Sequence, residues 1–344
     1  MSKQVTIKDV ALDAHVSITT ASFALNNIKG RVSQKTRERV LESARKLKYT
    51  VNNNARSLRT SNSKTVMFAF SGEYLEERYL SHMASLTRCI EFADLVGYGI
   101  LLELVDSRCT LDELVQKFMR IWESGRVDGI IFQCFFEDHR DDELYRRLYK
   151  SGVNLVNISR IGDASDYPCV YLEEFQMVRD QVRYAVQKKY DKLYYVCRRH
   201  RTYGIRERGF LDEIAGEKVR GQILNYQTHD CGEEELWKTV GPVINDGKNE
   251  RRAFICWNDT DAMTLISVLK NHGVSVPGDV GVMGFDNIPL TEYVAPRLTT
   301  VSHPFSMMAG KAFDMLIKII RGEELTRAET HIAVDSEIIE RDSM

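Results

Sequence analysis

The sequence predicts a small all-α head of the helix-turn-helix type, joined to an α/β sensor made of two doubly wound parallel-sheet lobes. Apolar residues recur at helical spacing through roughly the first 50 residues. From residue 65 onward, short apolar strands alternate with helical stretches, a pattern typical of parallel sheets covered on both faces. Residues 1–64 hold 13 Lys and Arg against 4 Asp and Glu, whereas the rest holds 34 against 45. A basic unit joined to a larger acidic one is typical of a nucleic-acid reader with a separate sensor.

Two short helices are expected on either side of a tight bend near His15. Thr6 can cap the first helix, and Asp9 places an acidic side chain near its positive end. Ser17 can cap the second helix. The apolar sides of both helices are rich in small residues that let the backbones approach closely: Ile7, Val10, Ala11, Ala14, Ala21, Ala24 and Leu25.

A third, basic helix is expected to start near Ser33. Its apolar stripe, at helical spacing, consists of Val40, Leu41, Ala44 and Leu47. This periodicity favours a folded unit over a basic tail without function. The other face of the helix is cationic and carries Lys35, Arg37, Arg39, Arg45, Lys46 and Lys48.

In helix-turn-helix units, the N-terminal residues of the second helix enter the major groove of DNA. Serine and threonine hydroxyls there can bond to base edges or phosphates, and Ile18 can pack against a thymine methyl group. The alternative is a three-helix module that binds protein. The predicted reading residues are Ser17, Ile18, Thr19, Thr20 and Ser22.

The head resembles the N-terminus of the lactose/galactose repressor family of bacterial transcriptional regulators. The match is nearly continuous through TIKDVALDAHVSITTASFALNN (6–27), RVSQKTRERVLESARKLKY (31–49) and NNNARSLRT (52–60). The resemblance implies a helix-turn-helix domain over residues 1–50 and a hinge helix or linker over residues 51–64. It extends the predicted DNA-binding set to Thr6, Asn26, Arg31, Asn53, Ala55, Arg56 and Leu58.

In this family the hinge folds into a short helix on DNA and wedges a leucine into the minor groove, and Leu58 occupies that position. Such a wedge unstacks base steps and bends the duplex, so that the duplex contacts more protein. Asn52, Asn53 and Asn54 have poor helix propensity, which fits a hinge that forms its helix only on DNA. The alternative is an ordinary polar linker.

Three positions of the head depart from the family pattern. Phe23 stands where the family usually has an arginine that reaches a base or a phosphate, and a phenyl ring cannot form those hydrogen bonds. His15 replaces the usual turn glycine, and Val51 replaces the usual proline. We therefore predict no operator sequence.

The sensor is expected to contain strands at 65–70, 99–105, 128–133, 154–158, 192–197, 219–224, 253–257 and 280–285. This span is too long for one compact sheet, so two similar lobes are expected. Ligands of such sheets bind beyond the carboxyl ends of the strands. The residues that directly follow the strands are therefore expected to line a cleft: Ser71, Tyr74, Gln133, Phe135, Ser159, Arg160, Arg198, Arg199, Asn258, Asp259 and Asp286.

Four later segments extend the resemblance over nearly the whole chain. They are GIRERGF (204–210), WNDTDAM (257–263), VSVPGDVGVMGFDNIPLTEYVAPRLTTV (274–301) and EIIERDS (337–343). The resemblance implies a periplasmic-binding-protein-like sensor. Together with the cleft argument, it predicts effector contacts from Tyr74, Gln133, Arg160, Arg198, Arg206, Trp257, Asn258, Asp259 and Asp286.

The expected sensor spans residues 65–344. One lobe is expected over about 65–162 and 293–324, and the other over about 163–292 and 325–344. Sugars suit such a cleft because a carboxylate accepts bonds from two vicinal hydroxyls, while Asn and Arg supply matching donors.

Each predicted effector contact also has a structural alternative. Asn258 and Asp259 can cap the helix that follows them. Asp286 can satisfy backbone amides in a turn, and Arg206 can lie on a helix surface. Trp257 fits the core as well as it fits the cleft.

The segment 198–201, Arg-Arg-His-Arg, is densely basic and follows a predicted strand. It suggests an anionic effector, such as a sugar phosphate, held by Arg206 and one or two of these arginines. The alternative, which we favour, is a solvated loop paired with acidic neighbours. Glu173 and Glu174 stand where the family tends to have Asp-Asn, so the family geometry does not carry over there.

The seven cysteines are scattered and include no Cys-x-x-Cys pair, which favours reduced thiols in a cytosolic protein. Cys197 with His200, and His229 with Cys231, are isolated pairs, so we expect neither a metal site nor a cofactor. No apolar run is long enough to span a bilayer, and the N-terminus has no signal-peptide pattern. We therefore expect a cytoplasmic protein without a membrane partner.

These features predict a repressor of carbohydrate-use genes that binds a near-palindromic operator in double-stranded DNA. A small sugar or sugar-phosphate effector is expected to control it by binding one of two sensor states more tightly. Some relatives form tetramers through a C-terminal leucine segment; the last strand is followed by no such segment here, so we expect a homodimer. Other relatives use a phosphorylated carrier protein as co-effector, and we keep such a partner as an alternative for this chain.

Two other classes of protein share part of the pattern. A periplasmic sugar-binding protein would have a similar two-lobed sensor, but the basic head and the missing signal peptide count against it. The second class is an α/β enzyme. The sequence contains no G-x-S-x-G, G-x-x-x-x-G-K-[ST], G-x-G-x-x-G or H-E-x-x-H motif, so we expect that the protein is not an enzyme.

Overall fold

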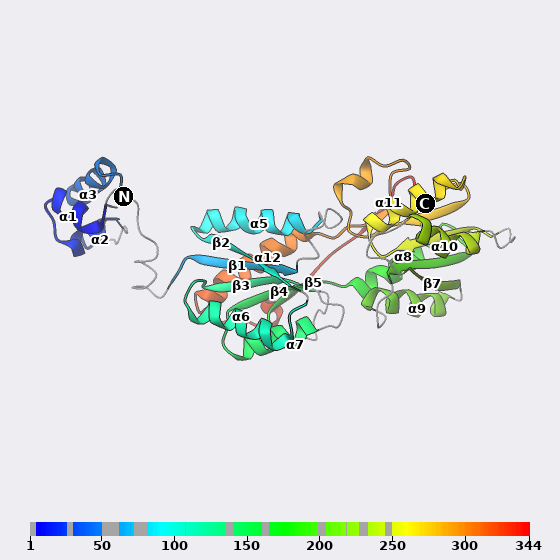
Figure 1. Ribbon diagram of the computed structural model, residues 1–344, viewed down its shortest axis with the longest axis horizontal. Coiled ribbons are helices and arrows are strands. Elements are labelled where there is room, and N and C mark those ends of the chain that lie inside the picture. The colour runs from blue at the N-terminus through cyan, green and yellow to red at the C-terminus, as the bar shows by residue number, and fades with distance from the viewer. Residues whose placement is uncertain are drawn as a thin grey trace. The chain divides into compact units, whose positions relative to one another are not determined.

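The computed structural model describes residues 5–25, 30–49, 62–71, 81–106, 108–134, 140–159, 165–198, 204–217, 219–226, 233–244 and 250–344. The chain divides into two compact units, Met1–Ser63 and Lys64–Met344. Figure 1 shows that the first unit is helical and that the second combines helices and strands, which confirms the predicted fold class. The helices of the head are α1 (Ile7–Asp13), α2 (Ile18–Leu25) and α3 (Gln34–Lys46).

Side-chain caps start each of these three helices, and those at Thr6 and Ser17 were predicted. Thr6 and Asp9 form a capping box, in which the Thr6 backbone N–H donates to Asp9 Oδ2 at 2.8 Å. The Ser17 hydroxyl accepts the Thr20 backbone N–H at 3.0 Å, and Ser33 caps α3 in the same way. The caps fix where α2 begins, and so which side chains its first turn presents.

The three helices of the head enclose a small apolar core. His15 adopts a φ of 50° in the bend between α1 and α2, a left-handed conformation that glycine adopts without strain. Alanines at the helix crossings keep the backbones close, so few atoms suffice to fill the space between them. The fully or almost fully buried residues of this core include Val10, Ala14, Ala21, Ala24 and Val40.

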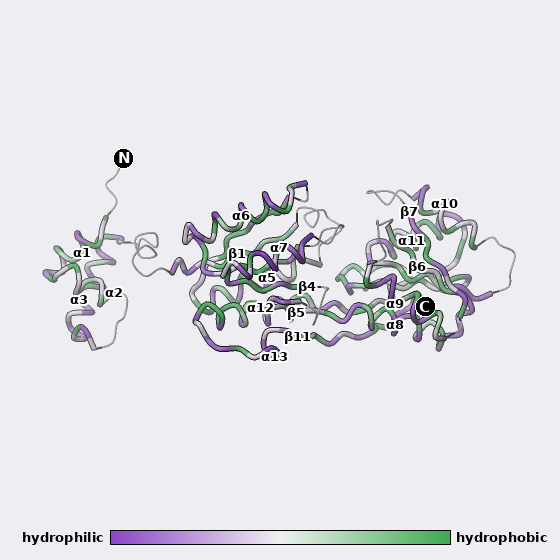
Figure 2. The backbone as a smooth tube through the Cα atoms, turned by 90° about the horizontal axis from the view of Figure 1, so that it is seen from below, coloured by the Kyte–Doolittle hydropathy of each residue, from purple (hydrophilic) through white to green (hydrophobic). Residues whose placement is uncertain are grey.

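The first lobe of the sensor is built on a parallel sheet of β1 (Thr65–Ser71), β2 (Gly99–Val105), β3 (Gly129–Gln133), β4 (Leu155–Ser159), β5 (Cys169–Leu172) and β11 (His331–Val334). The strand order is β11-β5-β4-β3-β1-β2. One face packs against α5 (Ser81–Val96) and α12 (Phe305–Ile320), and the other against α6 (Leu111–Glu123) and α7 (Arg140–Lys150). Figure 2 shows α6 and α12 on opposite sides of this sheet.

The second lobe is built on a parallel sheet of β6 (Lys192–Arg198), β7 (Arg220–Tyr226), β8 (Arg252–Cys256) and β9 (Val280–Met283). The strand order is β7-β6-β8-β9. α8 (Glu174–Gln187) and α9 (Ile205–Glu217) pack on one face, and α10 (Glu233–Ile244) and α11 (Asp259–Asn271) on the other. These strands start within one residue of the predicted positions.

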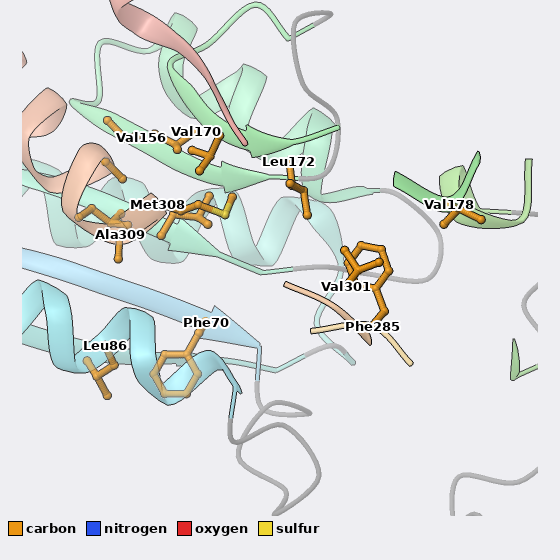
Figure 3. Close-up of a cluster of buried hydrophobic side chains, with 14 of the residues drawn as sticks. Phe70, Leu86, Val156, Val170, Leu172, Val178, Phe285, Val301, Met308 and Ala309 are labelled. Atoms are coloured by element: carbon orange, nitrogen blue, oxygen red, sulfur yellow. The ribbon is translucent and has the colours of Figure 1, made fainter. Parts of the chain in front are cut away.

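Three connections link the two lobes: from β5 to α8, from β10 (Thr300–Val301) to α12, and from β11 to β12 (Ile338–Ile339). β10 and β12 pair antiparallel, which ties two of the connections together. Figure 3 shows Phe285 and Val301 side by side in the buried cluster near these connections. A 3-10 helix at Pro289–Glu292 and a short α13 (Arg327–Thr330) complete the described elements.

The structure corrects the predicted lobe boundaries. β5 and β11 belong to the first sheet, although the prediction assigned both to the second lobe. Residues 293–301 were assigned to the first lobe, yet Leu298 lies in the core of the second and the Gly284 N–H donates to the Thr299 carbonyl at 2.9 Å. β5 and β11 were missed because they pair with each other across a long stretch of chain, which no local pattern records.

None of the helices in the described part of the chain is both long and apolar enough to cross a membrane.

Candidate functional site

The first turn of α2 presents the predicted reading residues of the head. Ile18 is 45% exposed and Thr19 is exposed as well, so both side chains are open to a partner. The hydroxyls of Ser17 and Thr20 lie 2.8 Å apart and are engaged in the cap. Ile18 and Thr19 are therefore the exposed side chains of this turn that take no part in the cap.

The other predicted head residues divide into three groups. Thr6 and Arg31 are exposed, as a contact with DNA requires. Ser22 is only 3% exposed and lies beside Ala21 on the buried side of α2. The predicted contact of Ser22 with the groove is therefore wrong. The remaining predicted residues lie outside the described part of the chain: Asn26, Asn53, Ala55, Arg56 and Leu58.

In the sensor, the predicted cleft residues that the structure describes lie at the carboxyl ends of strands. Gln133 ends β3, Trp257 and Asn258 follow β8, and Asp286 follows β9. Arg206 joins them from the first turn of α9. Tyr74, Phe135, Arg160 and Arg199 lie outside the described residues, as do the side chains of Ser159 and Arg198.

Arg206 is buried, and Glu174 binds one edge of its guanidinium group through both carboxylate oxygens. Arg206 Nε and Nη2 donate to the two carboxylate oxygens of Glu174 at 3.0 and 2.8 Å, and Nη1 donates to the Trp257 carbonyl at 2.5 Å. The guanidinium carbon lies 3.7 Å from the ring centroid of Phe285 and 5.1 Å from that of Trp257. Burial alone would lower the pKa of Arg206, but the Glu174 carboxylate outweighs it and the net pKa is raised. Arg206 is therefore not the surface residue of the alternative interpretation.

Asp286 and His303 extend this cluster toward the connection between the lobes. Asp286 Oδ1 lies 3.8 Å from Arg206 Nη2, and its backbone adopts a φ of 113°, outside the usual range for an L-residue. His303 Nε2 lies 4.0 Å from Glu174 Oε1, and its ring stacks on Phe305 with centroids 3.6 Å apart. Because Phe305 begins α12 of the first lobe, the cluster is in contact with both lobes.

Trp257 and Asn258 take different roles in the turn after β8. Trp257 is partly buried: it packs against the margin of the apolar core and also lies against the Arg206 guanidinium. The Asn258 side chain accepts the Asp261 backbone N–H at 2.7 Å and caps α11. Asn258 therefore caps a helix, which is the structural alternative given for this residue.

Asp259 is a structural residue, which corrects its predicted role in effector binding. It is 0% exposed, its Oδ2 accepts the Ile288 N–H at 2.8 Å, and its Oδ1 accepts the Thr300 hydroxyl. A Cβ atom at position 284 would lie only 2.2 Å from Asp259 Oδ1, so only glycine fits there. Burial, together with the charge of Asp286, raises the pKa of Asp259 well above its usual range. Asp259 holds the loop that carries Asp286 but cannot itself reach a ligand.

Replacing Asp259 with alanine is expected to lower the free energy of unfolding of the sensor by about 2 to 4 kcal/mol, because a buried N–H and a buried hydroxyl lose their acceptor. Urea unfolding followed by tryptophan fluorescence measures this loss. Asp112→Ala is a matched control, because its side chain is 76% exposed and pairs only at the surface with Arg147. Equal stability of the two variants would contradict the structural role of Asp259.

Sequence reasoning missed the partner of Arg206. Glu174 precedes Arg206 by 32 residues and lies on another helix, so no local spacing indicates the pair. The signal that existed was the departure at positions 173 and 174, where the family tends to have Asp-Asn. The described residues contain no group of three or more His, Cys, Asp or Glu arranged to hold a metal ion.

Two parts of the chain match known protein families. Residues 6–52 match the model of "Bacterial regulatory proteins, lacI family", and residues 182–344 match a "Periplasmic binding protein-like domain". The HTH-type transcriptional regulator RegA of Clostridium acetobutylicum is 30% identical over 343 residues, which cover 98% of each chain. The chain belongs to the lacI family. GalR of Escherichia coli, another HTH-type transcriptional regulator, is 26% identical, with 91% of this chain and 89% of GalR aligned.

Solved structures agree on the fold of this lacI-family chain. The lac repressor dimer bound to operator and the anti-inducer ONPF matches with a TM-score of 0.83 and 20% identity, and 99% of each chain is covered. The complex of the regulator CelR with cellobiose matches with a TM-score of 0.66 and 20% identity, over 99% of this chain and 100% of CelR. With its head and its full-length relatives, this lacI-family chain is a DNA-binding transcriptional regulator.

Proposed function

We propose that this regulator represses carbohydrate-use genes and that a small sugar, bound between the sensor lobes, changes its affinity for a near-palindromic operator. One observation carries the proposal. The Arg206 cluster combines a carboxylate at Asp286, aromatic rings at Trp257 and Phe285, and contacts to both lobes at His303. A ligand there would bind one arrangement of the lobes better than another, which is the thermodynamic requirement for control. Because bacterial operators are cytoplasmic, the regulator would act in the cytoplasm.

In the head, Ile18 and Thr19 would contact base edges in the major groove, and Arg31 would contact phosphate. These three side chains are exposed, which supports the assignment. The predicted hinge residues would then contact the minor groove at the centre of the operator.

A homodimer would place two heads on the two half-sites of the operator. Support comes from exposed apolar side chains on α5 and on β2, the edge strand of the first sheet. Leu95 is 80% exposed, and a contact between copies would bury it. The other large exposed residues of this face are Met83, Ile90, Leu102 and Leu104.

Asp286→Ala tests the proposal. The variant is expected to lose the ligand-dependent change in operator affinity. Of the two carboxylates beside Arg206, Glu174 is buried and paired, whereas Asp286 is partly exposed and can accept sugar hydroxyls. Fluorescence anisotropy of an operator duplex, titrated with a panel of sugars, measures the change. Asp314→Ala is the control, since Asp314 is 60% exposed and pairs with Lys318 on α12. A full ligand response in the Asp286 variant would contradict the proposed cleft.

A further inference from the structure

Arg206 can bind an anionic ligand only if its N–H donors are not already used within the protein. A guanidinium group binds phosphate or carboxylate through its paired N–H donors. In this chain all three nitrogens are already engaged: two with Glu174 and one with the Trp257 carbonyl. Phe285 and Trp257 cover the faces of the group. An anionic ligand would have to displace a buried carboxylate that already forms the same paired geometry.

The surroundings of Arg206 are also rich in negative charge. Glu174 and Asp286 lie against the guanidinium group, and Glu207 follows Arg206 on α9 and is itself buried. An added phosphate would meet this excess of carboxylates in a poorly solvated place, where like charges repel strongly.

The cluster contains a buried carboxylate oxygen that lacks a donor. Glu207 is 2% exposed, and within the described part of the chain its Oε2 has no hydrogen-bond partner. A buried carboxylate oxygen without a donor is destabilising, and a group that brings a donor relieves that cost. A ligand hydroxyl or ammonium group is therefore favoured in this cluster, and a second acceptor is not.

We propose that the second-lobe side of the cleft selects ligand groups that donate hydrogen bonds, hydroxyl or ammonium, over phosphate and carboxylate, and that Glu174 sets this selectivity by neutralising Arg206. The inference rests on the proposed function, because it assumes that the effector binds at this cluster. It favours a neutral sugar or an amino sugar over the sugar phosphate that the basic segment 198–201 suggests.

Inorganic phosphate is the first probe, because it tests the arginine without knowledge of the effector. Isothermal calorimetry in buffers of matched ionic strength is expected to detect no saturable phosphate site in the parent chain. Glu174→Gln keeps the length of the side chain but removes its charge, and is expected to tighten phosphate binding at least about tenfold. The double variant Glu174→Gln/Arg206→Gln is expected to lose that gain. Glu174→Asn provides a second neutral variant if the glutamine variant does not fold, and Glu174→Asp is the charged control.

Glucose, glucosamine and glucose 6-phosphate form the second set of probes, with the same chain and the same calorimetry. The parent is expected to bind the phosphate ester no more tightly than the other two. Phosphate binding by the parent that Arg206→Gln abolishes would overturn the inference, and so would neutral variants that gain no phosphate binding. Neither readout involves DNA, so failure of this inference is distinct from failure of the proposed function, which operator titrations detect.

Discussion

Replacing Arg206 with alanine is expected to destabilise the sensor by about 3 to 5 kcal/mol, because it leaves the buried carboxylate of Glu174 without its partner. The change also removes the donor to the Trp257 carbonyl and leaves a gap beneath the ring of Phe285. All three tryptophans of the chain lie in the sensor, at positions 122, 237 and 257. Denaturation followed by tryptophan fluorescence therefore reports on this unit rather than on the head.

Two further variants separate a buried ion pair from a general loss of packing. Replacing Glu174 and Arg206 together is expected to recover part of the loss, because no unpaired charge then remains buried. Arg297→Ala breaks an ion pair with Asp342 whose side chains are 59% and 51% exposed, and is expected to change the stability of the sensor little. An Arg206→Ala variant as stable as Arg297→Ala would contradict the assignment of Arg206 to a buried cluster.

Operator affinity is expected to fall about 10³- to 10⁵-fold between 50 and 200 mM salt if the bound dimer neutralises about six to ten phosphates. The reason is the composition of residues 1–64, which carry 13 Lys and Arg against 4 Asp and Glu. Each cation that neutralises a phosphate releases condensed counterions, and added salt opposes that release. Anisotropy titrations of a labelled duplex at several salt concentrations give the slope.

Ligand binding by the sensor is the internal control for this experiment. The cluster around Arg206 is buried and its charges are paired within the protein, so the affinity for a neutral sugar should change little over the same salt range. A flat salt response of DNA binding would contradict the role of the basic head.

The fold could be predicted from the sequence wherever a local pattern carries it. The caps at Thr6 and Ser17, the start of α3 near Ser33 and the long apolar strands such as β6 depend on near neighbours in the chain. All of these predictions are confirmed. β5 and β11 depend instead on a sheet edge formed by segments about 160 residues apart, a pairing that no local pattern records. The predicted lobe boundaries were wrong because they also depend on contacts between distant segments.

In the candidate site too, residues marked by a local pattern could be predicted and residues placed by tertiary packing could not. Arg206, Trp257 and Asp286 were predicted because a strand end or a family motif marks them, and the structure brings them together. The partner of Arg206, and the burial of Asp259 behind Asp286, depend on which helices and turns pack together, which no local spacing records. The predicted groove contact of Ser22 was wrong because a serine beside an apolar stripe can face the core as easily as the solvent.

The account depends most on the claim that the basic head reads a specific DNA sequence under the control of the sensor. A selection from random oligonucleotides with the purified full-length chain, with and without a broad carbohydrate panel, tests this claim directly. The account predicts enrichment of a near-palindromic site whose recovery changes when one of the sugars is added. Recovery of unrelated sequences under every condition would contradict it.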